Sequence, residues 1–146
     1  MKRIISYRSM FGATKTTTLA ELKTTYRNLI KEWHPDKIQD DEARKAEAEL
    51  KSQKIIEAYH LLVGIAPETH AANAEEYLRV TTTLAIEDFE YKDKDERLKI
   101  IFQDNVVYEY FGVPKKIYVK FVNAPSLPRF AKRHIYNDFL YRNVSN

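Results

Sequence analysis

The stretch from Thr18 to Pro35, TLAELKTTYRNLIKEWHP, constrains the fold more than any other part of the chain. Thr18 and Glu21 form a T-x-x-E capping box, which fixes where a helix begins because each residue satisfies a backbone amide near the other. Pro35 fixes where the helix ends, since proline lacks an amide N–H and pushes His34 into extended geometry. The segment between them predicts an amphipathic helix, with apolar residues at spacings of three and four: Leu19, Leu22, Tyr26, Leu29, Ile30 and Trp33.

A second long helix is predicted from about Asp41 to Val63, with Gly64 as its stop because glycine is common just after a helix C-terminus. Two helices of similar length joined by the short segment HPDKIQD indicate an antiparallel hairpin, with residues 34–36 at its exposed tip. The expected buried stripe of the second helix consists of Leu50, Ile55, Ala58, Tyr59 and Leu62.

The chain after Gly64 changes in character. Residues 65–80 are rich in alanine and acidic residues and are expected to form a connecting helix or linker. Three segments rich in β-branched and aromatic residues then predict strands, and turn-forming residues at 103–105 predict a hairpin between the last two. The expected elements are strands in 81–91, 97–102 and 106–111, a helix after Pro114 that ends before Ala124, and a short helix with an ordered terminal segment in 129–143.

The predicted fold class is multidomain: an all-α helical hairpin followed by a small α+β domain with a short antiparallel sheet. A length of 146 residues suits one ordinary domain or two small ones. The predicted boundaries are 1–64 for the first domain, 65–80 for the connector and 81–146 for the second domain.

Cysteine is absent, which excludes a disulfide framework and thiolate zinc clusters and fits a reducing compartment. No run approaches the roughly 18 apolar residues that a membrane span needs. The N-terminal MKRIISYRSMF is interrupted by polar residues too early for a signal-peptide core. We therefore expect a cytoplasmic protein without a membrane partner.

His34 and Asp36 are candidates for acid–base catalysis, but a hairpin tip is exposed and such chemistry needs a desolvated pocket. Metal binding lacks ligands, because the four histidines are scattered and no H-E-x-x-H motif is present. We therefore expect no enzyme, no catalytic residue, no metal and no cofactor. The alternative is that residues 34–36 have no function and form a solvated loop after the end of the helix.

A row of basic residues, called here the basic stripe, argues against a loop without function. Lys23, Arg27 and Lys31 recur every four residues, so they share one helix face that leads toward the tip with Asp36 and Lys37. A tip held rigid by Pro35 loses little entropy on binding. The pattern indicates a docking surface for another protein.

The same residues resemble the opening of a J-domain, the DnaJ-type module. The resemblance covers about residues 4–64. The unbroken His34-Pro35-Asp36-Lys37 matches the family's HPD loop, and residues 54–62 resemble the end of its third helix. Further matches in register are Gly12, Leu22, Lys23, Tyr26, Arg27 and Leu29.

This resemblance implies a co-chaperone that docks on a DnaK-type chaperone ATPase and stimulates ATP hydrolysis there. The implied chaperone-binding residues are Lys23, Arg27, Lys31, His34, Pro35, Asp36 and Lys37. Two departures stand out: Ser52 falls near a position where the family usually has a buried phenylalanine, and no basic fourth helix follows Gly64.

Residues 107–142 resemble a KTSC domain, a short module found at the end of some bacterial lysyl-tRNA synthetases. The matched features include the central Tyr108-x-Tyr110 and the run Gly112-Val113-Pro114. Pro128 stands where that family usually has glycine. RNA binding has been suggested for the family.

The C-terminal segment also has the composition of a nucleic-acid-binding surface. Residues 112–146 carry seven basic and one acidic residue, interleaved with aromatic rings. The alternative is that the rings form the core and the bases face solvent. The candidate nucleic-acid-binding residues are Lys115, Lys116, Lys120, Arg129, Lys132, Arg133, Tyr108 and Tyr110.

Two functional hypotheses follow. In the first, the chain is a co-chaperone for a DnaK-type ATPase, and the C-terminal domain directs it to a protein client, to RNA or to a ribonucleoprotein. In the second, the chain is an RNA-binding module whose J-like half does not stimulate a chaperone.

Overall fold

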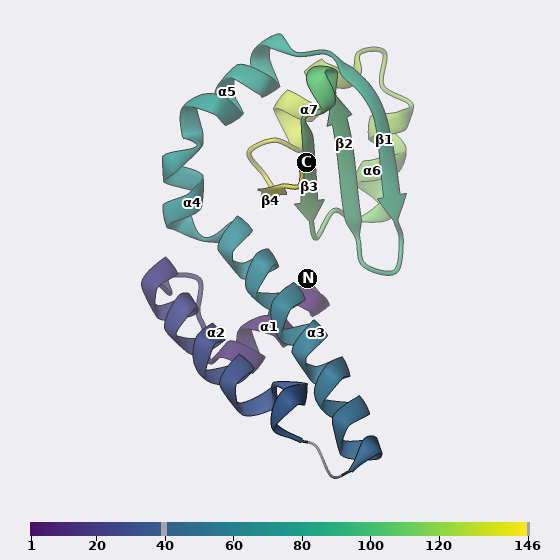
Figure 1. The fold of residues 1–146 in the computed structure, drawn as a ribbon. Coiled ribbons are helices and arrows are strands. Elements are labelled where there is room, and N and C mark those ends of the chain that lie inside the picture. The colour runs from purple at the N-terminus through teal and green to yellow at the C-terminus, as the bar shows by residue number, and fades with distance from the viewer. Residues whose placement is uncertain (39–40, 146) are drawn as a thin grey trace. The chain divides into compact units, whose positions relative to one another are not determined.

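The computed structural model describes residues 1–38 and 41–145, and the chain divides into two compact units. One unit spans Ile4–Thr69, and the other begins at His70 and includes Met1–Arg3. The predicted fold class is confirmed, because the first unit is helical and the second is a four-stranded antiparallel sheet with helices (Figure 1). Within the described residues, no helix is both long and apolar enough to cross a bilayer.

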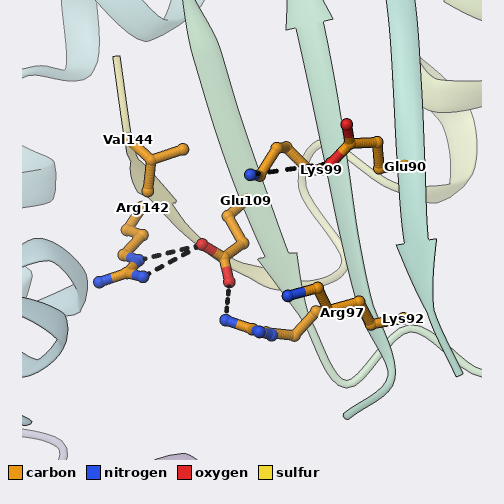
Figure 2. Close-up of a pocket in the computed structure, with 7 residues that line it drawn as sticks. All are labelled: Glu90, Lys92, Arg97, Lys99, Glu109, Arg142 and Val144. Carbon is orange, nitrogen blue, oxygen red and sulfur yellow. Dashed lines mark hydrogen bonds and ion pairs between the residues drawn. The ribbon is translucent and has the colours of Figure 1, made fainter. Parts of the chain in front are cut away.

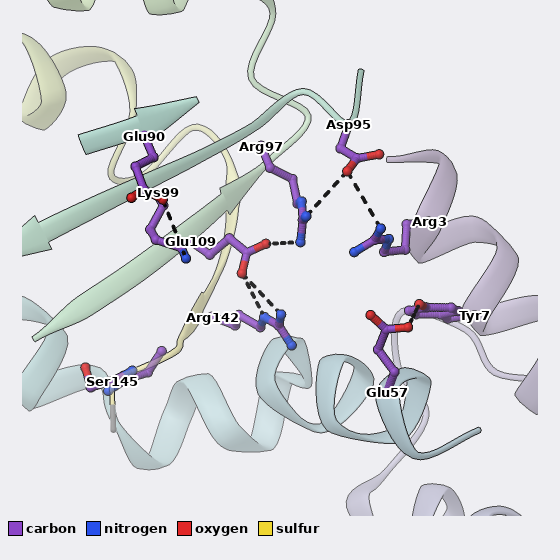
Figure 3. A network of polar contacts seen from close by, with 11 residues as sticks. Arg3, Tyr7, Glu57, Glu90, Asp95, Arg97, Lys99, Glu109, Arg142 and Ser145 are labelled. Atoms are coloured by element: carbon purple, nitrogen blue, oxygen red, sulfur yellow. Dashed lines mark hydrogen bonds and ion pairs between the residues drawn. The ribbon is translucent and has the colours of Figure 1, made fainter. Parts of the chain in front are cut away.

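The helical unit is built on a hairpin of two long helices, α2 (Leu19–Trp33) and α3 (Glu42–Ile65), which pack against each other. The capping box is confirmed: Thr18 accepts from the backbone of Glu21, whose side chain in turn accepts from the Thr18 amide. Helix α1 (Lys2–Phe11) adds Ile4, Tyr7 and Phe11 to the core of the chain. Tyr7 donates to Glu57 at 2.7 Å, which joins α1 to α3 (Figure 3).

The end of α3 differs from the prediction. Gly64 does not stop the helix, which continues through Ile65 and ends where Ala66 turns extended before Pro67. A helix tolerates glycine at a modest cost, whereas the residue before proline is forced out of the α region. Pro67 then opens the short helix α4 (Pro67–Ala72).

The buried stripe of α3 was also predicted only in part. Leu50 was expected inside but is 67% exposed, because the inward face there is formed by Ala48 and Ser52. Tyr59 is half-buried and stacks on Tyr26 with 4.2 Å between ring centroids. The other predicted members are buried, as expected: Ile55, Ala58 and Leu62.

The expected connector is helical and contributes to the second unit. Helix α5 (Ala74–Thr83) buries Tyr77 and Val80 in the sheet domain's core, so that unit begins earlier than the expected residue 81. The threonines at 81–83 were expected in a strand but form the last turn of α5. Their hydroxyls donate to carbonyls three or four residues back, which suits a helix.

The sheet runs in the order β1-β2-β3-β4, and every neighbouring pair is antiparallel. The predicted hairpin at 103–105 is confirmed: Asp104 and Asn105 adopt left-handed backbone angles, which these residue types tolerate better than most. The ordered terminal segment is a fourth strand paired with β3. The strand bounds are β1 (Ile86–Lys92), β2 (Arg97–Phe102), β3 (Val107–Phe111) and β4 (Leu140–Asn143).

One face of the sheet carries the apolar core. Alternate residues of β2 and β3 point to that face. Helices α5, α6 (Lys115–Val122) and α7 (Leu127–His134) contribute further buried residues, as do Val113, Ile135 and Tyr136 outside these helices. The core residues of the two central strands are Leu98, Ile100, Phe102, Tyr108 and Tyr110. The residues between them point to the second face, called here the charged face because it carries Arg97, Lys99 and Glu109, joined by Arg142 of β4.

Candidate functional site

The tip of the helical hairpin is a structured turn. His34 ends α2 in extended geometry, and Pro35–Lys37 form one turn of 3-10 helix. The Asp36 amide donates a hydrogen bond to the His34 ring nitrogen Nδ1 at 3.3 Å. The same nitrogen lies 3.5 Å from the Asp36 carboxylate, so a protonated ring would pair with it instead. The proline stop thus orients both polar groups.

These two groups are presented to solvent. The His34 side chain is 48% exposed and the Asp36 side chain is 86% exposed. Acid–base catalysis requires groups that are shielded from water, and this tip has the opposite environment. The arrangement suits contact with another macromolecule.

Ser52, the departure noted in the sequence, supports the tip from α3. Its hydroxyl donates to the Trp33 carbonyl at 2.8 Å, and the side chain is buried. That carbonyl belongs to the last turn of α2, where helix carbonyls lack an internal partner. Lys51 lies over the Trp33 ring at 5.6 Å. A hydrogen bond from α3 therefore holds the last turn of α2.

The predicted basic stripe lies on the outward face of α2. Lys23, Arg27 and Lys31 are all exposed, while the apolar residues of the same helix are buried or half-buried. Lys37 is exposed in the 3-10 turn. The structure therefore places all the predicted chaperone-binding residues on one continuous helix and the turn that follows it.

The candidate bases of the second unit are also exposed. They come from two consecutive helices, α6 and α7, and the half-buried rings of Tyr118 and Phe130 lie on the same helices. Ser126 caps α7 by accepting from the Arg129 amide. Pro128 falls in the first turn of α7, where a missing amide proton costs nothing. The exposed bases are Lys115, Lys116, Lys120, Arg129, Lys132 and Arg133.

Two candidate nucleic-acid-binding residues need correction. Tyr108 and Tyr110 are 2% and 0% exposed, so their rings cannot stack on bases. Both point into the apolar core, where Tyr110 pairs with the Tyr77 hydroxyl at 3.0 Å. Burial raises the pKa of both Tyr110 and Tyr77, which keeps these phenols neutral. The Tyr-x-Tyr motif is therefore structural in this chain.

A charge cluster on the charged face was missed by sequence reasoning. Glu109 is 4% exposed, and both its carboxylate oxygens accept from arginine. Arg97 of β2 donates to one oxygen, and Arg142 of β4 donates to the other at 3.2 and 3.3 Å (Figure 3). Glu109 is directly opposite Arg142 in the strand register. The clue in the sequence was an acid in the middle of an otherwise apolar strand.

The first unit is a basic helix that ends in a proline-fixed turn and packs on a longer helix. The family model of the DnaJ domain matches residues 7–67, and that of the KTSC domain matches residues 83–139. The chain therefore carries a J-domain followed by a KTSC domain, as the resemblances indicated.

Curated relatives match the first domain only in part. The chaperone protein DnaJ of Hydrogenobacter thermophilus is 41% identical over 59 residues, which is 40% of this chain and 15% of the relative. The chaperone protein DnaJ of Thermotoga petrophila is 43% identical over 56 residues, which is 38% of this chain and 14% of the relative. The chain thus spans a small part of the length of these relatives.

A solved structure matches the second domain. It is the crystal structure of a KTSC domain protein from Yersinia pestis, with 30% sequence identity and a TM-score of 0.41. The match covers 43% of this chain and 87% of that protein.

Proposed function

We propose that the chain is a co-chaperone that docks on a DnaK-type chaperone ATPase and stimulates its ATP hydrolysis. The observation that carries this proposal is the ordered His34–Asp36 turn at the end of the exposed basic face of α2. In this proposal the catalytic chemistry belongs to the partner, and the exposure of both side chains to solvent supports that division. Binding that favours one conformation of the partner would shift its equilibrium toward that conformation.

The basic stripe and the His34–Asp36 turn would have different roles in docking: the stripe supplies charge and the turn supplies shape. Lys23, Arg27 and Lys31 would attract an acidic patch on the partner and fix the register of docking. The turn would then deliver the His34 and Asp36 side chains at a fixed distance beyond the helix. A partner conformation that offers acceptors for both elements would bind more tightly than one that offers acceptors for the stripe alone.

The docking step is tested by reversing one charge of the stripe. Arg27→Glu is expected to raise the concentration needed for half-maximal stimulation of ATP turnover about tenfold, since a lost charge pair with added repulsion costs about 1.4 kcal/mol or more. Steady-state ATP hydrolysis by a DnaK-type chaperone measures this. Arg44→Glu is the matched control, because Arg44 is an exposed arginine on α3.

Equal effects of the two reversals would contradict docking through α2. Failure of the unsubstituted chain to stimulate any DnaK-type chaperone would contradict the proposed function itself.

A specific feature favours RNA as a partner of the second domain. A hollow of about 270 Å³ beside α7 is lined by a ring, two arginines and a histidine, which offers both stacking and charge. The Phe130 and His134 rings lie 4.7 Å apart at this place. The lining residues are Ala124, Pro125, Ser126, Arg129, Phe130, Arg133 and His134. We propose that this surface directs the co-chaperone to RNA or to a ribonucleoprotein client.

The RNA proposal is tested by the salt dependence of binding to single-stranded RNA. Lys132→Ala/Arg133→Ala is expected to lower the slope of log affinity against log salt by about 1.4, since each lost phosphate contact removes about 0.7. Gel shift at several salt concentrations measures it. Arg44→Ala/Lys45→Ala removes an adjacent exposed basic pair from α3 and is the matched control. Absence of binding even at low salt would rule this role out.

A further inference from the structure

The charged face of the sheet contains a cavity that neither proposed function uses. Its volume is about 230 Å³, and its walls come from β1, β2, β3 and the C-terminal strand (Figure 2). Six of the seven lining residues are ionisable, and one is apolar. They are Glu90, Lys92, Arg97, Lys99, Glu109, Arg142 and Val144.

The cavity walls carry more positive than negative charge. Four basic side chains meet two carboxylates, which leaves a net charge of +2. Glu90 is held by Lys99 at 3.8 Å, and Glu109 is held by Arg97 and Arg142. Both carboxylates are thus paired already, and they do not neutralise the remaining bases. Arg97 is also paired with Asp95 at 3.4 Å, and an anion would complement the basic side chains that remain.

Some donors of the cavity have no acceptor within the described part of the chain. The Arg97 Nε atom is buried and has no hydrogen-bond partner there. A buried polar group without a partner costs about 1–3 kcal/mol, so a native fold usually satisfies it. Lys92 forms no ion pair among residues 1–38 and 41–145. Figure 2 shows both side chains on the lower rim of the cavity.

Glu109 organises these donors without competing for them. Its two oxygens fix two guanidinium groups in place, and a guanidinium presents five donors in a rigid fork. Arg97 remains part of the cavity wall, and its buried Nε still has no acceptor among the described residues. The same carboxylate also lowers the net charge, which makes the site suit a small dianion.

We propose that this cavity binds the phosphate group of a phosphate monoester. A phosphate carries close to two negative charges near neutral pH and three acceptor oxygens, which match the net charge and the unused donors. A carboxylate has one charge and only two acceptor oxygens. The esterified part of the ligand would lie over Val144, the apolar residue of the wall.

The test is a titration of the full chain by NMR, with inorganic phosphate and with glycerol phosphate, against sodium chloride of equal ionic strength. Amides of residues 92, 97, 99 and 109 are expected to show saturable shifts with both phosphates and none with chloride. Tighter binding of glycerol phosphate would indicate a monoester ligand, and equal binding would indicate that free phosphate suffices.

Two variants sharpen the test. Lys92→Gln is expected to weaken phosphate binding about fivefold, since an exposed charge pair contributes up to about 1 kcal/mol. Lys92 is exposed and outside the Glu109 cluster, so the fold is retained. Lys45→Gln on α3 changes another exposed lysine, is the matched control and is expected to bind phosphate normally. Equal shifts with chloride would overturn the proposal. So would phosphate binding that Lys45→Gln weakens and Lys92→Gln does not.

Discussion

Replacing His34 with glutamine is expected to reduce stimulation of a DnaK-type ATPase at least tenfold while the chain stays folded. The imidazole Nδ1 accepts from the Asp36 amide and so holds the turn in one shape. Glutamine has more freely rotating bonds, and ordering them costs free energy. The helix stop remains, because Pro35 is unchanged. Steady-state ATP turnover measures the loss.

Folding of this variant can be followed independently. Trp33 is the single tryptophan and lies directly before the tip, so its fluorescence reports on the end of α2. Thermal unfolding followed by this signal is expected to match the unsubstituted chain. His60→Gln changes an exposed histidine on α3 and is the control. Unchanged stimulation of ATP hydrolysis by the His34→Gln variant would contradict the proposal that the tip acts on the partner.

Replacing Glu109 with alanine is expected to cost the sheet domain about 3 kcal/mol of unfolding free energy or more. Removing one partner of a buried ion pair leaves the other charge uncompensated, which typically costs about 3–5 kcal/mol. Here two arginines lose their acceptor: the side chains of Arg97 and Arg142 are only 11% and 19% exposed. Urea unfolding followed by tyrosine absorbance measures the loss.

The matched control lies on the same face. Glu90→Ala removes an acid whose side chain is 61% exposed, and its single lysine partner can be hydrated instead. Its effect is expected within about 0.5 kcal/mol, as for most surface substitutions. Both measurements belong in phosphate-free buffer, since a bound anion would stabilise the folded state. Similar losses for the two variants would show that the Glu109 cluster is not a central support of the sheet.

The parts of the fold that the sequence predicted well are locally encoded. Both ends of α2 were predicted because Thr18, Glu21 and Pro35 fix the backbone within one helical turn of their own positions. The β2–β3 hairpin was predicted because Asp104 and Asn105 accept left-handed angles. The basic stripe could be predicted for the same reason, since helix periodicity alone places it on one face.

The parts that were missed depend on residues far apart in the chain. Strand β4 forms because residues 140–143 pair with β3, about 30 residues earlier, and nothing in its local sequence indicates that partner. The Glu109 cluster depends on the same pairing, which brings Arg142 opposite the carboxylate. Tyr108 and Tyr110 have the composition of a stacking surface, and only the tertiary fold shows that they are buried.

The start of α2 forms a hydrogen bond with a residue that is synthesised about 50 residues later. The Leu19 amide, which has no partner within its own helix, donates to the side chain of Glu68 at 3.0 Å. Thr69 donates to the Val63 carbonyl at 2.6 Å, which fastens the following helix to the end of α3. During synthesis, α2 can form early but gains this acceptor only after residue 68 has emerged. A recombinant fragment that stops at Gly64 would lack both ties, so the natural cutting point of this J-domain lies after Thr69.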